Sequence, residues 1–178
     1  ETNLTGCLTF IDTRVNNINV YSKNLNCEDS VNFIRTFGKI NNIEIYDSLS
    51  DGLDMDFSKI NINNLKILNS KNDCADFSYG TYTINRVEVK NCGDKGLSVG
   101  EKSNVKINTF NSTYSGFGVV SKDSSKTTIT DAKISNVKFC LGAYNKKPEF
   151  NGAFLSIKKL NCNKYEKKLF KDNLSKIF

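Results

Sequence analysis

The stretch 82-YTINRVEV-89 carries the pattern that decides the fold. Its apolar residues Ile84, Val87 and Val89 stand at offsets of 0, +3 and +5. The same offsets recur along the chain, with first members 25, 22, 22, 23, 22 and 28 residues apart. The triplets are Val15/Ile18/Val20, Ile40/Ile43/Ile45, Ile62/Leu65/Ile67, Ile84/Val87/Val89, Ile107/Phe110/Ser112, Ile129/Ala132/Ile134 and Ile157/Leu160/Cys162. So constant a spacing indicates an internal repeat.

Each repeat contains two short alternating segments. In the fourth, 75-ADFS-78 precedes 82-YTINRVEV-89, and Asn, Gly and Ser residues separate repeats. Short segments rich in β-branched residues and bounded by turn residues are typical of strands. A repeat of about 22 residues with two or three such strands forms one coil of a solenoid, and the Leu and Asn frame of a leucine-rich repeat is missing. The sequence therefore predicts an all-β fold, a single-stranded right-handed parallel β-helix of about seven coils.

The repeat also sets the expected organisation of the chain. We expect residues 1–163 to form the β-helix and residues 164–178 to form a C-terminal cap or final strand. The chain begins with Glu1, so we expect further domains in a longer parent protein. The last triplet follows an insertion in 144-YNKKPEFNG-152, which is either a plain connection or a loop that protrudes on one flank, as insertions in solenoids do. The apolar residues expected to cap the last coil, as a short helix or a strand, are Leu169, Phe170, Leu174, Ile177 and Phe178.

Composition excludes several classes of function. No run of about 18 apolar residues occurs, so we expect no membrane insertion. Residues 1–120 hold 12 Lys and Arg against 14 Asp and Glu, and residues 121–178 hold 13 against 5. The basic half is interpreted as a Lys-rich solvated surface, because only three of the basic residues are Arg and no nucleic-acid motif is visible.

The six cysteines allow two interpretations. They can form three bridges in any of 15 connectivities. Alternatively, they can be small buried residues that fill the core of the repeats, which is the favoured interpretation. Their spacing matches no zinc motif, and the chain has no His. The cysteines are Cys7, Cys27, Cys74, Cys92, Cys140 and Cys162.

Aspartates recur in register in two consecutive repeats. Alternation in 51-DGLDMDFS-58 is predicted to bury Leu53, Met55 and Phe57. Asp54 and Asp56 then face solvent, and Asp76 of 73-DCADFSYG-80 lies on the same face, about 5 Å away on the next coil. Two like charges at 4 Å repel by about 1 kcal/mol in water and about 4 kcal/mol at an effective dielectric of 20. These carboxylates therefore require a cation, a shared proton or basic neighbours.

Three interpretations of the aspartates stay open. Asp51 and Asp73 share a turn position, Asp94 lies within one residue of it, and all three can accept hydrogen bonds from backbone amides. Asp54, Asp56 and Asp76 can bind Ca²⁺ through carboxylate oxygens. A pair of the same residues can perform acid–base chemistry on a sugar.

A second polar band follows on the next coils. It comprises 94-DKGLSVGEKS-103 and 121-SKDSS-125, and Tyr144 and Lys146 of the inserted loop extend it. Lys95 beside bound Ca²⁺ is a candidate base for β-elimination from a uronic acid, provided that its pKa is lowered. The ligand-binding candidates of this face are Asp51, Asp73, Asp94, Glu101, Lys122, Asp123, Tyr144 and Lys146.

The succession DGLDMDFS, NDCADFSYG, GDKGLSVGEKS, SKDSS and YNKKPEF resembles a group of bacterial right-handed parallel β-helix repeat proteins. The resemblance covers about residues 40–155. It implies a pectate-lyase-like solenoid, of a kind often attached to spore-coat-type kinase-like modules or found in surface-associated chains. Polygalacturonases and epimerases of similar architecture use a His, which this chain lacks.

Three hypotheses of function follow. The first is a non-catalytic module of a larger surface or secreted protein that recognises carbohydrate or protein, with Ca²⁺ as its one candidate cofactor. The second is a polysaccharide lyase, C5-epimerase or glycoside hydrolase that uses carboxylates on adjacent coils. The third is a structural spacer of a virion or filament. The first two place the protein outside the cell or at its surface.

Overall fold

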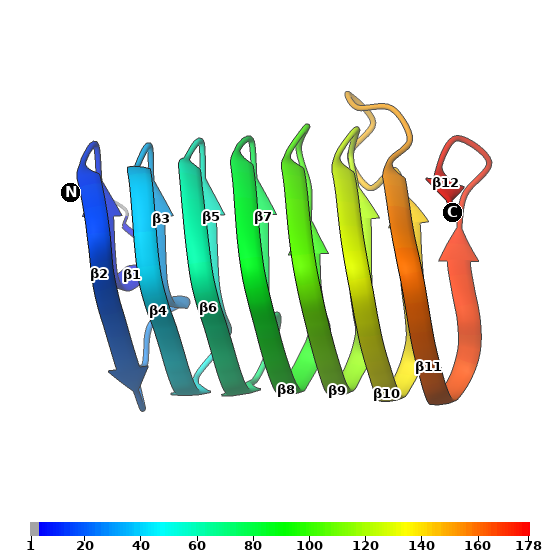
Figure 1. The fold of residues 1–178 in the computed structure, drawn as a ribbon, viewed down its shortest axis with the longest axis horizontal. Coiled ribbons are helices and arrows are strands. Elements are labelled where there is room, and N and C mark those ends of the chain that lie inside the picture. The colour runs from blue at the N-terminus through cyan, green and yellow to red at the C-terminus, as the bar shows by residue number, and fades with distance from the viewer. Residues whose placement is uncertain (1–3) are drawn as a thin grey trace.

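The computed structural model describes residues 4–178, and within that range every regular element is a β-strand. The strands stack in parallel into a β-solenoid of about 8 turns (Figure 1). The predicted parallel β-helix is confirmed. The turn count slightly exceeds the predicted seven, because β12 begins a further passage without a triplet. The strands are β1 (Gly6–Ile11), β2 (Arg14–Lys23), β3 (Asp29–Ile34), β4 (Phe37–Ser48), β5 (Asp51–Asp56), β6 (Lys59–Ser70), β7 (Ala75–Ser78), β8 (Thr81–Val99), β9 (Asn104–Lys122), β10 (Lys126–Tyr144), β11 (Phe154–Lys171) and β12 (Lys176–Ile177).

The coils present two long parallel faces. The triplet face consists of β2, β4, β6 and the first halves of β8 to β11, which lie side by side in Figure 1. The second face, here called the groove face, consists of β1, β3, β5, β7 and residues 95–99, 117–122, 139–144 and 167–171. Both faces direct alternate side chains into one core between them.

The triplets form the predicted columns in the core. Ile62 pairs with Ile84, and Ile84 pairs with Ile107, on successive strands of the triplet face. All three side chains are buried. A coil cannot bury such residues alone, so the stacking of equivalent positions is what provides the hydrophobic core.

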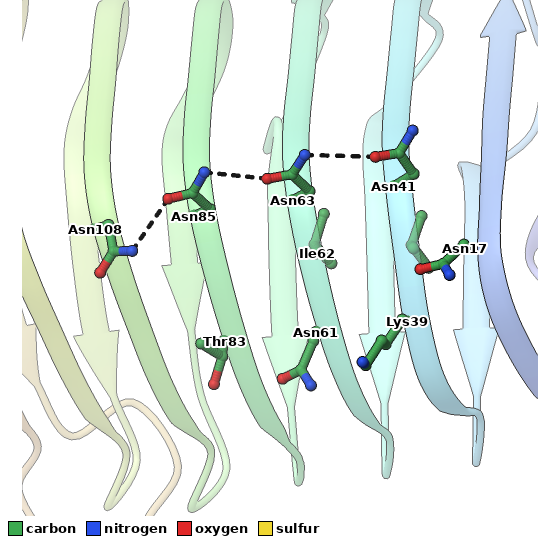
Figure 2. A pocket seen from close by; sticks show the side chains of 10 residues that line it. Asn17, Lys39, Asn41, Asn61, Ile62, Asn63, Thr83, Asn85 and Asn108 are labelled. Atoms are coloured by element: carbon green, nitrogen blue, oxygen red, sulfur yellow. Dashed lines mark hydrogen bonds between the residues drawn. The ribbon is translucent and has the colours of Figure 1, made fainter.

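Asparagine ladders run along the outside of the solenoid. The side-chain amide of Asn63 donates to the Oδ1 of Asn41 at 3.4 Å, and the same contact joins Asn85 to Asn63 and Asn108 to Asn85 at 3.1 Å each (Figure 2). Equivalent side chains are in contact because the coils are in register. The ladders add hydrogen bonds between coils to those of the backbone.

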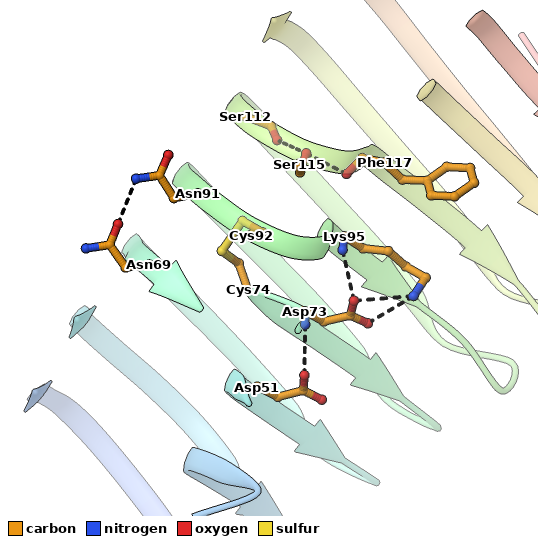
Figure 3. The surroundings of a disulfide bond; sticks show 10 residues. All are labelled: Asp51, Asn69, Asp73, Cys74, Asn91, Cys92, Lys95, Ser112, Ser115 and Phe117. Atoms are coloured by element: carbon orange, nitrogen blue, oxygen red, sulfur yellow. Dashed lines mark hydrogen bonds and ion pairs between the residues drawn. A yellow bond between two sulfur atoms is a disulfide. The ribbon is translucent and has the colours of Figure 1, made fainter. Parts of the chain in front are cut away.

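The cysteines are all disulfide-bonded, so the interpretation as unpaired core fillers is wrong. The bridges join Cys7 to Cys27, Cys74 to Cys92 (Figure 3), and Cys140 to Cys162. They span 20, 18 and 22 residues, close to one repeat. Each bridge therefore closes a single coil, a geometry that the repeat length permits because after one turn the chain lies one strand spacing, about 4.8 Å, from its start, within reach of a disulfide.

The last coil continues as strand. Residues 164–171 belong to β11, which pairs with β10, and β12 pairs with the start of β11. Of the apolar residues expected to cap this end, Ile177 packs against the core. The exposed ones are Leu169, Phe170, Leu174 and Phe178. Within residues 4–178, no helix has the length and apolarity that a membrane span requires.

The variant Cys74→Ser/Cys92→Ser tests the role of the central bridge. We expect the free energy of unfolding to fall by about 3 kcal/mol. Without the bridge the unfolded chain gains conformational entropy, and a closed loop of this length corresponds to a change of that size. Urea-induced unfolding followed by circular dichroism measures the change. Cys7→Ser/Cys27→Ser serves as the control and should cost less, because the outer coil has only one neighbour. An unchanged unfolding curve for the central variant would contradict this role.

Candidate functional site

The in-register strands of the groove face bring acidic residues of several coils together. Asn32 on β3 pairs with Asp54 on β5, and Asp54 pairs with Asp76 on β7. Strand alternation turns all three side chains away from the core. Asp54 and Asp76 border a groove with a volume of about 390 Å³, whose lining residues are Thr5, Glu28, Asp29, Asp51, Asp54, Asp56, Asp76, Ser78, Glu101, Lys122, Lys146 and Lys147.

Asp54 lies at the centre of this acidic groove. Burial raises the pKa of Asp54 to about 9, and the charges of Asp56, Asp29 and Asp76 add to the effect. Burial likewise raises the pKa of Asp56. The Asn32 amide donates to Asp54 Oδ2 at 3.0 Å and to Asp29 Oδ2 at 3.3 Å. Asp54 therefore holds a proton at neutral pH, which relieves the repulsion that the sequence predicts for carboxylates on neighbouring coils.

Asp76 has a cationic partner instead. The Lys122 Nζ lies 3.4 Å from Asp76 Oδ2, and the Lys122 side chain is only 6% exposed. Lys122 reaches back across Gly100, where a Cβ would stand 2.8 Å from Lys122 Cε. A side chain at Gly100 would thus displace the lysine. Asp76 Oδ1 and Asn32 Oδ1 are buried and accept no hydrogen bond from the described residues.

Glu101 closes the groove toward the inserted loop. Its carboxylate accepts a hydrogen bond from Ser78 Oγ and pairs with Lys147 Nζ at 2.7 Å. Burial raises the pKa of Glu101, but these two hydrogen bonds and the charge of Lys122 outweigh burial and lower the pKa below its usual value. Glu101 is therefore an ionised, paired carboxylate at neutral pH.

Asp51, Asp73 and Lys95 form a chain of contacts beside the groove (Figure 3). Asp51 Oδ1 accepts the backbone amide of Asp73 at 2.8 Å, and Asp73 Oδ1 accepts that of Lys95 at 2.9 Å. These two bonds agree with the turn-capping interpretation. Burial raises the pKa of Asp51 to about 6 and raises that of Asp73.

Lys95 does not have the properties of the proposed base. Its Nζ contacts Asp73 Oδ1 at 3.3 Å and also pairs with Asp94. Burial lowers the pKa of Lys95, but the charge of Asp73 and the contact with Asp94 outweigh burial and raise the pKa above its usual value. An ammonium held in this way cannot remove a proton from a sugar at neutral pH, so the geometry argues against β-elimination at Lys95.

Asp123 lies outside the groove and fixes the inserted loop. It is fully buried, and its Oδ1 accepts the backbone amides of Lys146 at 2.6 Å and Lys147 at 2.8 Å. The loop leaves the groove face between β10 and β11 (Figure 1). These bonds place Lys146 and Lys147 at the groove wall, whereas Tyr144 lies at the end of β10 in an aromatic cluster.

An aromatic pair flanks the groove at the turn after β5 and β7. The prediction that Phe57 is buried is wrong: its side chain is 51% exposed. Phe57 has a φ of 52° and Tyr79 a φ of 49°, so the chain leaves the strand at both residues and alternation no longer applies. Their rings stack at 4.6 Å with an interplanar angle of 5°, and Phe150 of the loop packs against Tyr79 at 6.1 Å.

The structure brings together most of the residues that the sequence singled out. Asp51, Asp54, Asp56, Asp76, Glu101, Lys122 and Lys146 line the groove, whereas Asp73, Asp94, Lys95, Asp123 and Tyr144 do not. Sequence reasoning missed Asp29, which lines the groove, and Asn32, which lies beneath it and donates to Asp54. The repeat could have identified them, because 28-EDSVNFI-34 stands 22 residues before the next coil and pairs with it in register. The other missed lining residues are Thr5, Glu28, Ser78 and Lys147.

The groove does not fit a calcium ion. Within the described range, no three acidic or cysteine side chains converge as the ligands of a metal would. The Asn32 amide donates to Asp54 Oδ2, so one oxygen of that carboxyl already has a partner. We derive no role for calcium at Asp54, Asp56 and Asp76.

Comparisons of the chain with protein-family models, with curated proteins and with solved structures find no match. The function is therefore argued from the geometry of the groove.

The variant Asp54→Asn tests the protonated carboxyl. The folded protein holds the Asp54 proton up to about pH 9, whereas the unfolded chain releases it near pH 4. The unfolded state therefore binds fewer protons between these values, and stability falls as pH rises through this range. We expect Asp54→Asn to raise the melting temperature at pH 8 and to flatten its decline with pH.

Melting temperatures measured from pH 4 to pH 9 check this expectation. Asp131→Asn, on the triplet face, is the matched control and should follow the wild type. A decline with pH that is as steep in Asp54→Asn as in the wild type would contradict the raised pKa.

Proposed function

We propose that the protein binds a polysaccharide along the acidic groove. One observation carries the proposal: a groove lined by carboxyl, hydroxyl and ammonium groups, all able to form hydrogen bonds, lies next to an exposed, stacked aromatic pair, Phe57 and Tyr79. Sugar rings offer hydroxyl groups for the first and apolar C–H faces for the second. An exposed aromatic pair in a soluble domain also indicates a binding surface.

The charge of the groove selects the class of sugar. Seven of its lining residues are Asp or Glu and three are Lys. Asp54 holds its proton, and the remaining carboxylates still outnumber the lysines. A polyuronate would be repelled, so the groove favours neutral sugars and amino sugars.

The context of the proposed module follows from other features. Three disulfides favour an oxidising compartment, which agrees with a secreted or surface protein. Membership of the bacterial β-helix group, with attached kinase-like or other modules in the parent chain, is part of this proposal and rests on the phrases of residues 40–155. Protein recognition by the same face is the alternative within this class.

Titration calorimetry with three oligosaccharide series tests the proposal. We expect glucosamine oligosaccharides and cello-oligosaccharides to bind and oligogalacturonides not to bind. Added salt should weaken binding of the glucosamine series alone, because salt screens only the charged contacts. Tyr79→Ala should weaken binding about fivefold to tenfold through loss of one stacking contact.

Asp131→Asn is the control and should bind as the wild type does. Failure of all three series to bind would overturn the proposal and favour the structural spacer, in which the face has no ligand. Binding of oligogalacturonides in preference to the other two would contradict the argument from charge.

Glycoside hydrolysis is a second candidate, favoured by one observation. Asp54 keeps a proton at neutral pH while Asp76 on the next strand is paired with Lys122. A glycosidase uses two carboxyl groups, one as acid and one as base or nucleophile. In this scheme Asp54 donates its proton to the glycosidic oxygen as the bond to the sugar breaks, and Asp76 takes a proton from the attacking water.

Release of reducing ends from the bound oligosaccharide tests this second candidate. Asp76→Asn should abolish turnover and retain binding, because the groove keeps its shape and hydrogen-bonding groups. Binding without any release of reducing ends by the wild type would assign the groove to recognition alone.

A further inference from the structure

A second hollow on the groove face lies toward the C-terminal coils. Phe117 and Phe139 stack at 4.5 Å with an interplanar angle of 15°. The Phe170 ring stands edge-on to both, at 5.8 Å and 5.5 Å, and the Tyr144 ring stands edge-on to Phe170 at 5.4 Å. We call these four residues the aromatic bowl. Its cavity of about 500 Å³ is completed by Asn145, Lys146, Lys171 and Asp172.

A glycine makes room for the bowl. A Cβ at Gly142 would stand 3.1 Å from Cδ1 of Phe117 and 3.0 Å from Cγ2 of Val120. Gly142 pairs with Phe170 on the next strand, so the bare backbone lets the rings of neighbouring coils meet across it. The Phe170 side chain is still 45% exposed. The bowl is therefore an open aromatic surface rather than part of the core.

The bowl and the acidic groove are parts of one surface. Lys146 lines both hollows. Lys95, which pairs with Asp73 beside the groove, lies directly next to Phe117 on the following strand, and Phe117 pairs with Phe139. Asp76 and Gly142 stand three coils apart in the same column, about 14 Å at the usual strand spacing. A short oligosaccharide is long enough to span that distance.

We infer that the aromatic bowl binds further sugar rings of the same glycan chain that the acidic groove holds. This inference rests on the proposed function. The groove supplies hydrogen bonds to hydroxyl or amino groups, and the bowl supplies apolar ring faces for stacking. The glycan then runs along the solenoid axis, across the strands, and its affinity depends on its length.

The test compares a glucosamine disaccharide with a glucosamine hexasaccharide by titration calorimetry. Wild-type protein should bind the hexasaccharide more tightly, because only the longer chain reaches both hollows. Phe170→Ala should lower the affinity for the hexasaccharide about fivefold to tenfold and leave that for the disaccharide unchanged. Phe178→Ala is the matched control: this phenylalanine is also exposed on the last coil, but it packs on Phe154 and lines neither hollow.

Several outcomes would overturn the inference. Equal affinity of Phe170→Ala and wild type for the hexasaccharide would do so while leaving the proposed function intact. An equal loss of affinity for the disaccharide and the hexasaccharide in Phe170→Ala would also overturn the inference, because the effect would then lie in the acidic groove. A wild-type dimer in sedimentation equilibrium that Phe170→Ala dissociates would assign the bowl to a second copy of the chain. If the wild type binds neither sugar, the proposed function itself fails. Thermal melting of each variant separates these outcomes from misfolding.

Discussion

Register between coils is the constraint on which the rest of the structure depends. The chain returns to an equivalent position about every 22 residues, so residues at equivalent positions of neighbouring coils lie about 4.8 Å apart. Inside, this produces the isoleucine columns. Outside, it produces the asparagine ladders and places carboxylates against each other. The same register therefore stabilises the core and brings carboxylates of like charge close together in the groove.

The repulsion between these carboxylates is relieved in three different ways on neighbouring coils. Burial and nearby charge leave Asp54 protonated. Asp76 pairs with Lys122, a residue from two coils away. Glu101 stays ionised through contacts with Ser78 and Lys147. Because each of these carboxyl groups is stabilised by a different contact, the groove presents donors, acceptors and charge at defined places, which is the basis of the proposed recognition of sugars.

The sequence predicts the periodic part of this arrangement and misses the part that breaks the period. The isoleucine columns and the pairing of Asp54 with Asp76 follow from spacing alone. The exposure of Phe57 does not, because a left-handed turn residue escapes strand alternation. The contact of Lys122 with Asp76 could not be predicted either, because the lysine side chain occupies space that is free only since Gly100 has no side chain. Contacts made by the inserted loop depend on its conformation, which no repeat determines.

The closure of single coils by the disulfides has a consequence for the molecule under load. No bridge in the described chain joins one end of the solenoid to the other, so under a pulling force along the axis the coils without a bridge are held to their neighbours by noncovalent contacts. A coil that is peeled off under tension remains a closed ring where it carries a bridge. It then releases little extensible chain, because the residues between the two sulfurs cannot straighten. The bridges thus limit how far a torn coil can lengthen rather than how easily it detaches.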